Sequence, residues 1–241
     1  MNDILLNLIV LAVFGGLGIL LFIFLQQRKR QKNAQFMQMA KEKGWEVERI
    51  QEPLRSGYRL RGKNSACSWT IETLAEANSV ESGPGSSDVS HSTRWWSEDI
   101  TLPDRGLVLG PMNNPGDAKM LSTMGNSIMN RVLKTLVGKD SEWATGLSFV
   151  EDAGSDQFRK KYLCLASQKE DAVQMLQPGV EKLLLALANQ HKPILKFHAN
   201  GLEISIPTEQ LLDQSSLDLM VNLGKVCVES WEGGKQNIDA K

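Results

Sequence analysis

The sequence predicts an α+β protein in which one N-terminal transmembrane helix precedes a mainly antiparallel sheet covered by helices. Three observations lead to this fold class. An unbroken apolar run occupies residues 4–25, short alternating segments follow it in pairs, and helical periodicities stand between and after these pairs. Hairpins with helices set between them are typical of an antiparallel sheet that helices cover.

The apolar run at 4–25 has the length of a membrane span. About 22 residues give a helix of roughly 33 Å, and a hydrocarbon core is about 30 Å thick. A cleaved signal peptide is the alternative, but it has a positive n-region, a shorter apolar core and a small-residue cleavage site. Residues 1–3 contain no Lys or Arg, and Gln26 and Gln27 follow the run. We therefore predict an anchor.

A basic cluster directly after the apolar run predicts its orientation. Its members are Arg28, Lys29, Arg30 and Lys32. Positively charged flanks stay in the cytoplasm, so we predict a single-pass protein of the cell inner membrane, with its N-terminus outside and its C-terminal domain cytoplasmic. A recognition site for an anionic lipid is the alternative role of these cations. In the run itself, Ala12 and Gly16 have the small-residue spacing that allows membrane helices to form a homodimer.

The predicted organisation has five segments. Residues 1–3 are a short extracytoplasmic tail, and residues 4–25 span the lipid bilayer. Residues 26–44 are a basic juxtamembrane stalk and helix, residues 45–232 a cytoplasmic α+β domain, and residues 233–241 a disordered tail. Small polar residues at about 75–93 predict a mobile loop inside the domain.

Alternation of apolar and polar residues predicts the strands of the first half of the domain. We expect them at 45–50, 58–61, 69–74, 94–96 and 106–110, with a hairpin between the second and the third. After Asn114 and Pro115, apolar residues recur at intervals of three and four as far as Leu136. This pattern predicts a helix that ends near Gly138.

In the second half of the domain, the residue patterns predict both strands and helices. We expect strands at 146–150, 158–166, 194–198 and 202–206, and helices at 169–177, 179–190 and 209–231. Ser167 and Glu170 have the spacing of a capping box at the start of the first of these helices. Asn200-Gly201 between two alternating runs indicates a hairpin, because both residues tolerate a positive φ.

Charge and composition narrow the classes of function. The formal net charge is −1, and the only basic cluster lies beside the apolar run. Phosphate neutralisation requires several clustered cations, so we predict no nucleic-acid partner. The cysteines Cys67, Cys164 and Cys227 lie in separate apolar segments without ligand spacing. They predict buried reduced thiols, with a reactive thiol as the alternative.

No pattern of a catalytic, cofactor or metal site stands out. His91, His191 and His198 lack the close, regular spacing of metal ligands. The chain contains no Gly-x-Ser-x-Gly motif. Its adjacent carboxylate pairs project in different directions, whereas acid–base catalysis needs carboxyls that converge. We therefore predict a non-enzymatic protein without cofactors.

The dipeptide Trp95-Trp96 is the most unusual local feature. In a strand its two indoles point to opposite faces of the sheet. Unless helices cover both faces, one indole is exposed and suits contact with a protein partner. A lining role in a small-ligand pocket is a further alternative.

Several segments together resemble bacterial single-pass membrane-anchored proteins of unknown function. They are the apolar run with its basic stalk, Phe158-x3-Tyr162-Leu163-x-Leu165-Ala166, Leu176-x-Pro178, Leu183-Leu184 and Gly201-Leu202-Glu203-Ile204. The resemblance covers the anchor and mainly the last 80 residues. Such families have no established activity, so it implies no catalytic residue.

The sequence thus favours a protein-interaction or scaffold role with an unidentified protein partner. The alternative is a membrane-tethered domain that binds a small ligand or a lipid in a pocket between sheet and helices. An enzyme with an unrecognised site is the third hypothesis.

Overall fold

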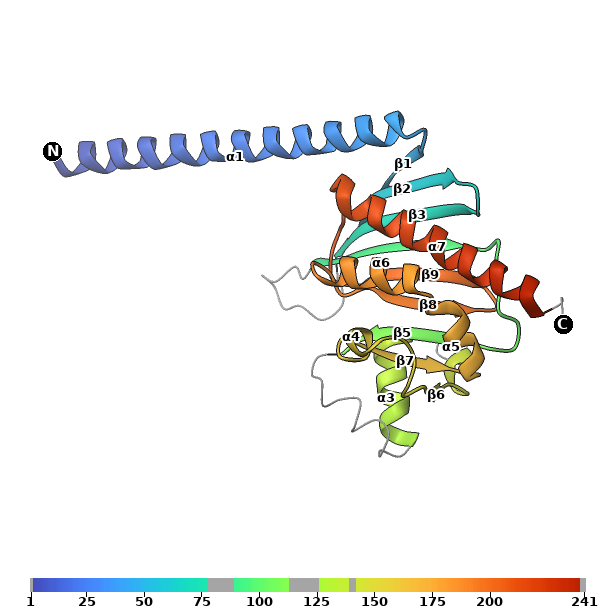
Figure 1. Cartoon of the computed structure of the whole chain (residues 1–241). Coiled ribbons are helices and arrows are strands. Elements are labelled where there is room, and N and C mark those ends of the chain that lie inside the picture. Colours follow the sequence, from blue (N-terminus) through green and yellow to red (C-terminus); the bar gives the residue numbers. More distant parts are fainter. Residues whose placement is uncertain (1, 78–88, 113–125, 139–141, 239–241) are drawn as a thin grey trace. The chain divides into compact units, whose positions relative to one another are not determined.

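The structure is a computed structural model that describes residues 2–77, 89–112, 126–138 and 142–238 (Figure 1). It divides the chain into two compact units, Met1–Gly44 and Trp45–Lys241. The second unit contains the sheet and every residue of the candidate site.

The first unit is built on a single helix, α1 (Asn2–Glu42). In the part of the chain that the structure describes, no helix has both the length and the apolarity to cross a membrane.

This finding corrects several predictions. The transmembrane helix over 4–25 is wrong as part of the fold class, and so is the single-pass inner-membrane location with the N-terminus outside. The bilayer contact predicted for 4–25 stays a prediction. The side chains of Ala12 and Gly16, predicted to pair two helices, lie outside those that the structure describes.

The second unit is built on one sheet, which has nine strands among the described residues. The strand order is β1-β2-β3-β4-β9-β8-β5-β7-β6, and every neighbouring pair is antiparallel. The prediction of a mainly antiparallel sheet with helices agrees with this part of the structure. The strands are β1 (Glu46–Glu52), β2 (Arg55–Lys63), β3 (Ser68–Ala77), β4 (Val89–Ser97), β5 (Leu107–Pro111), β6 (Ser148–Phe149), β7 (Tyr162–Ala166), β8 (Ile194–His198) and β9 (Gly201–Ile206).

The helices of this unit lie on both faces of the sheet. They are α3 (Asn126–Val137), the short 3₁₀ helix η1 (Glu142–Ala144), α4 (Asp156–Arg159), α5 (Lys169–Met175), α6 (Pro178–Ala188) and α7 (Gln214–Ile238). The long helix α7 crosses β4 and β9 and packs beside α5 and α6 (Figure 1).

Side-chain alternation gives the sheet two different faces. On the face beneath α7, Trp95 packs against Gly224, and Phe197 meets Trp231 edge-on at 4.8 Å between ring centroids. On the opposite face, which we call the outer face, Val108 joins a buried cluster with Leu133 and Leu136 of α3. This cluster covers the β5–β7 end of the outer face. Towards β1, the outer face bears charged side chains.

Three local predictions differ from the structure. Phe158, predicted to be in a strand, lies in α4, because the Ser155 side chain accepts a hydrogen bond from the Phe158 amide and caps that helix. Ser167 does not cap α5, since its hydroxyl accepts from the Gly106 amide. The predicted disordered tail begins inside α7, which continues to Ile238.

The loop predicted at about 75–93 is shorter at both ends in the structure. Residues 75–77 and 89–93 belong to β3 and β4 and pair with each other, for example Ala75 with His91. Small polar residues hide the alternation that would have revealed these strand ends. Residues 78–88 and the predicted helix start at Asn114 lie outside the described residues.

Candidate functional site

The two adjacent indoles of β4 lie on opposite faces of the sheet. Trp95 is fully buried beneath α7, where its ring touches Gly224. Trp96 is half-buried on the outer face. Trp95 therefore offers no contact to a partner, while Trp96 borders a hollow.

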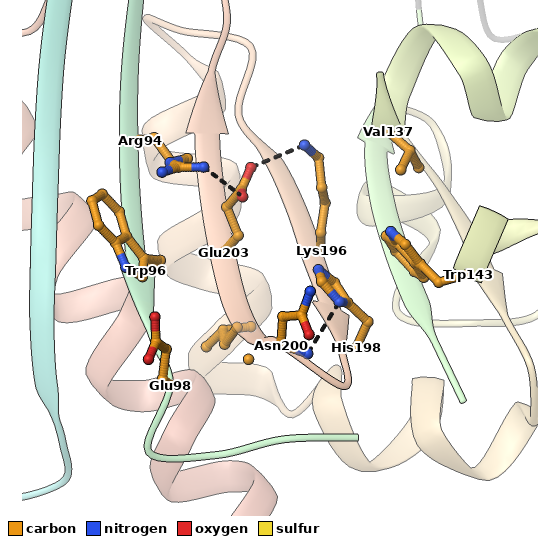
Figure 2. Close-up of a pocket in the computed structure, with 11 residues that line it drawn as sticks. Arg94, Trp96, Glu98, Val137, Trp143, Lys196, His198, Asn200 and Glu203 are labelled. Atoms are coloured by element: carbon orange, nitrogen blue, oxygen red, sulfur yellow. Dashed lines mark hydrogen bonds and ion pairs between the residues drawn. The ribbon is translucent and has the colours of Figure 1, made fainter. Parts of the chain in front are cut away.

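This hollow, which we call the Trp96 pocket, has a volume of about 360 Å³. It lies on the outer face where the strands β4, β9 and β8 meet the segment around η1 (Figure 2). Its volume is within the range of small-molecule sites, about 300–1,000 Å³. The lining residues are Arg94, Trp96, Glu98, Val137, Trp143, Lys196, His198, Asn200, Gly201, Leu202 and Glu203.

The β8–β9 hairpin forms one end of the pocket. The Asn-Gly signal correctly predicted this hairpin, but the turn is Ala199-Asn200, and Gly201 is the first residue of β9, where it pairs with His198. Gly201 has a φ of +115°, and a β-carbon there would collide with the Ser97 carbonyl oxygen. Only glycine permits this close approach. This close approach brings the start of β9 against Glu98, the residue that follows the end of β4.

Aromatic rings form two walls of the pocket. The Trp143 ring stacks on the His198 ring, with 4.3 Å between centroids and 20° between planes. On the other side, the Arg94 guanidinium lies 4.4 Å from the Trp96 ring centroid, a cation–π arrangement. Trp143 belongs to η1, far from β4 in the sequence, so sequence reasoning did not connect it with Trp96.

His198 is held in its neutral form. Its Nδ1 accepts a hydrogen bond from the Asn200 amide at 3.3 Å, which assigns the remaining ring proton to Nε2. Burial lowers the pKa of His198 below its ordinary value of 6.5; the charge of Glu203 raises it and that of Lys196 lowers it. The imidazole therefore gives the pocket a polar but uncharged surface at neutral pH.

Glu203 lies on the pocket floor between two cations. Its Oε1 accepts a hydrogen bond from Lys196 Nζ at 2.9 Å, and its Oε2 lies 3.7 Å from an Arg94 nitrogen. The side chains of Lys196 and Glu203 are 14% and 18% exposed, respectively. This ion pair is therefore largely shielded from solvent and defines the floor more firmly than a surface pair would.

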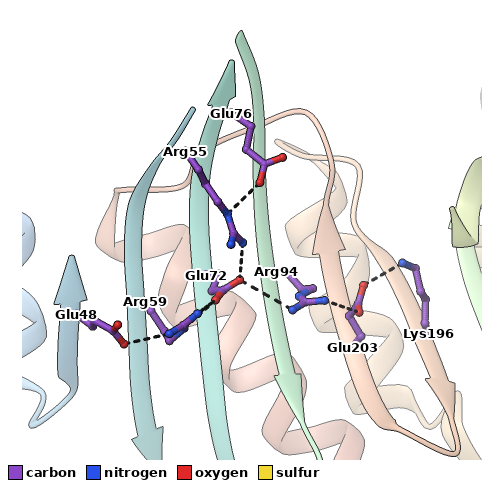
Figure 3. A network of polar contacts seen from close by, with 8 residues as sticks. All are labelled: Glu48, Arg55, Arg59, Glu72, Glu76, Arg94, Lys196 and Glu203. Carbon is purple, nitrogen blue, oxygen red and sulfur yellow. Dashed lines mark hydrogen bonds and ion pairs between the residues drawn. The ribbon is translucent and has the colours of Figure 1, made fainter. Parts of the chain in front are cut away.

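The floor continues as an ionic ladder across the outer face (Figure 3). Its centre is Glu72, whose side chain is 5% exposed. Glu72 accepts from Arg59 Nε at 2.7 Å and from an Arg55 nitrogen at 3.3 Å, and Arg94 lies 3.9 Å away. The ladder joins the six neighbouring strands β1, β2, β3, β4, β9 and β8 and orients Arg94 towards the pocket. Its members are Glu48, Arg55, Arg59, Glu72, Glu76, Arg94, Lys196 and Glu203.

A second polar cluster lies away from the pocket. His191 Nδ1 is 2.7 Å from Glu209 Oε2, and its Nε2 is 3.0 Å from Ser216 Oγ. The order of groups resembles that of a nucleophile, a base and an orienting carboxylate. Ser216 is only 2% exposed, and none of the three residues lines the Trp96 pocket. We interpret the cluster as a tie that fixes the start of α7.

The cations of the predicted basic cluster belong to the first unit, and the cysteines to the second. Arg28 is exposed on α1, and the side chains of Lys29, Arg30 and Lys32 lie outside those described. Cys67, Cys164 and Cys227 are buried and unpaired, as predicted. Burial raises the pKa of Cys164 to about 12, which keeps this thiol protonated and unreactive. Among the described residues, no group of three His, Cys, Asp or Glu side chains could hold a metal ion.

The fold and the pocket together define an α+β protein with an antiparallel sheet and an aromatic, ion-lined hollow on one face. No family model matches the chain, and no curated protein matches it. A search of solved structures finds the crystal structure of the mycobacterial trehalose monomycolate transport factor A, TtfA. The TM-score is 0.42 at 10% identity, over 84% of this chain and 93% of that chain. A similarity at this level supports no conclusion about function.

Proposed function

We propose that this protein binds a small polar organic ligand in the Trp96 pocket and does not transform it. The observation that supports the proposal is the pairing of two aromatic walls with a shielded ionic floor in one hollow of about 360 Å³. Most ligand sites have a predominantly apolar wall with a few convergent polar groups. The lining of this pocket is more polar than that, and therefore suits a polar ligand.

The lining residues favour binding over catalysis. Among the described lining residues there is no Ser, Thr or Cys, so these residues supply no hydroxyl or thiol nucleophile. The pocket's one imidazole accepts a backbone hydrogen bond through Nδ1. Its lone pair is therefore engaged and its Nε2 carries the proton, which disfavours a role as general base. The Lys196 ammonium is held by Glu203 at 2.9 Å, so its hydrogen bonding is directed to a carboxylate.

The shape of the site favours a small ligand over a protein partner. The interaction hypothesis depended on an exposed indole, and Trp95 is 0% exposed. Trp96 is half-buried beside a hollow and does not project from the surface. A ligand that enters the hollow reaches Trp96 more readily than a flat protein surface does.

Calorimetric titration of the full chain with a panel of small organic compounds tests the proposal. We expect a compound that binds the wild type and loses at least tenfold in affinity with Trp96→Leu. Trp45→Phe, which changes another partly buried indole outside the pocket, is the matched control and should bind normally. If every binding compound is indifferent to Trp96→Leu, the pocket is not the ligand site.

A further inference from the structure

The Trp96 pocket has opposite charges at its two ends. Arg94 and Lys196 lie at one end with Glu203 between them, so this end has one more positive than negative side chain. Glu98 lies at the other end, and Trp96 is between the two ends (Figure 2). Arg94, Trp96 and Glu98 follow one another at intervals of two along β4 and its continuation. At about 3.3 Å per residue, the backbones at 94 and 98 are roughly 13 Å apart.

The cations at one end retain unused hydrogen-bond donors. Arg94 lies 3.7 Å from Glu203 and 3.9 Å from Glu72, both longer than a hydrogen bond. Among the described residues, its guanidinium donates no hydrogen bond, although it has five N–H donors. Lys196 uses one of its three donors on Glu203. Both side chains can therefore hydrogen-bond an anionic group of a ligand.

The carboxylate at the other end is also available. Glu98 is exposed, and its side chain has no ion pair or hydrogen bond within the described residues. Its position on the pocket rim is fixed by the close approach of Gly201 to the backbone at Ser97 and Glu98. A cationic group that enters beside Trp96 would meet this carboxylate.

The described lining residues of the pocket are electrically balanced. They include two cationic side chains and two carboxylates, with a neutral His198. A purely anionic ligand would approach Glu203 and Glu98, and a purely cationic ligand would approach Arg94 and Lys196. Because a desolvated charge is costly unless it is paired, a molecule with one charge of each sign suits both ends.

We propose that the ligand is zwitterionic, namely a short peptide of two or three residues with both termini free. Its carboxylate binds Arg94 and Lys196, its ammonium binds Glu98, and its apolar side chain lies against Trp96 and Trp143. Two or three extended residues span about 7–10 Å. That length leaves room within the roughly 13 Å backbone separation for the side chains of Arg94 and Glu98. This inference depends on the proposed function.

Calorimetry with alanyl-alanyl-phenylalanine, its N-acetyl form and its C-terminal amide tests the inference on the wild-type full chain. We expect the free peptide to bind, and each blocked form to bind at least tenfold more weakly. Glu98→Gln should weaken the free peptide and leave the acetylated form unchanged. Arg94→Gln should weaken the free peptide and leave the amide unchanged. Arg61→Gln, which changes an exposed arginine of β2 outside the pocket, is the control.

The outcomes separate the two proposals. If the blocked peptides bind as tightly as the free one, or no peptide binds while another compound does so with dependence on Trp96, the zwitterion inference is overturned and the ligand pocket stands. If no compound binds with dependence on Trp96, the proposed function itself fails. The peptide series uses wild-type protein, so misfolding of a variant cannot obscure the result.

Discussion

At the residue scale, Gly201 links the fold to the pocket. Its φ of +115° and its contact with the Ser97 carbonyl leave no space for a side chain. We expect Gly201→Ala to lower the free energy of unfolding by about 2–4 kcal/mol, measured by urea denaturation. At Gly146, no atom lies within 4 Å of the position that a β-carbon would take, and its φ is not positive. Gly146→Ala should therefore change stability by less than about 1 kcal/mol. Equal effects would contradict the role of Gly201.

His198 makes stability depend on pH. Burial lowers its pKa in the folded state below 6.5, so the unfolded chain binds the proton more readily. The stabilisation is complete above about pH 6.5 and is lost as the pH falls through the folded-state pKa. We expect the free energy of unfolding of the wild type to fall more steeply between pH 7 and pH 5 than that of His198→Asn. Parallel curves for the two proteins would contradict this linkage.

At the scale of elements, Glu72 connects β2, β3 and β4 through one buried carboxylate. Glu72→Gln removes the charge that three arginines share, so we expect a loss of about 1–3 kcal/mol of stability. Partial exposure of the arginines, 28–48%, limits the effect. Glu48, whose side chain is 49% exposed, is the matched control, and Glu48→Gln should cost at most about 1 kcal/mol. Denaturation of both variants measures the difference.

Local patterns predicted many elements because their causes are local. The alternation in 194–198 and 202–206 and the Asn200-Gly201 turn predicted β8 and β9, which the structure confirms. The capping-box prediction was wrong because the Ser167 hydroxyl accepts a hydrogen bond from a distant amide and not from the start of α5. That amide belongs to Gly106, which is 61 positions away in the sequence. A side chain that can satisfy either a neighbouring or a distant amide cannot be assigned from spacing alone.

At the scale of the whole molecule, the sheet joins segments from both halves of the chain. β4 pairs with β9, and β5 pairs with both β7 and β8. We therefore expect the second unit to unfold in one cooperative transition. Near-UV circular dichroism and tryptophan fluorescence, which both report on this unit, should give superimposable thermal curves. Two separated transitions would show that the halves fold independently.

The Trp96 pocket shows where sequence reasoning reached its limit. The opposite orientation of Trp95 and Trp96 followed from the alternation of a strand, but which indole α7 covers did not. Trp143, Lys196 and Glu203 showed no local signal for a site, because they meet Trp96 only after β8 and β9 join β4. The apolar run at 4–25 led to a transmembrane prediction that the structure does not support among its described helices.

By itself, the sequence determined the kind of each well-patterned element, the β8–β9 turn, the two faces of β4 and the buried state of its cysteines. Tertiary structure alone decided the strand order, the face that α7 covers, the ionic ladder around Glu72 and the meeting of Trp96 with Trp143 and His198. The physical reason is the sequence separation over which each kind of interaction acts. Backbone propensity and side-chain alternation act between near neighbours, whereas strand pairing and burial are settled between residues more than a hundred positions apart, such as Trp95 and Ile204.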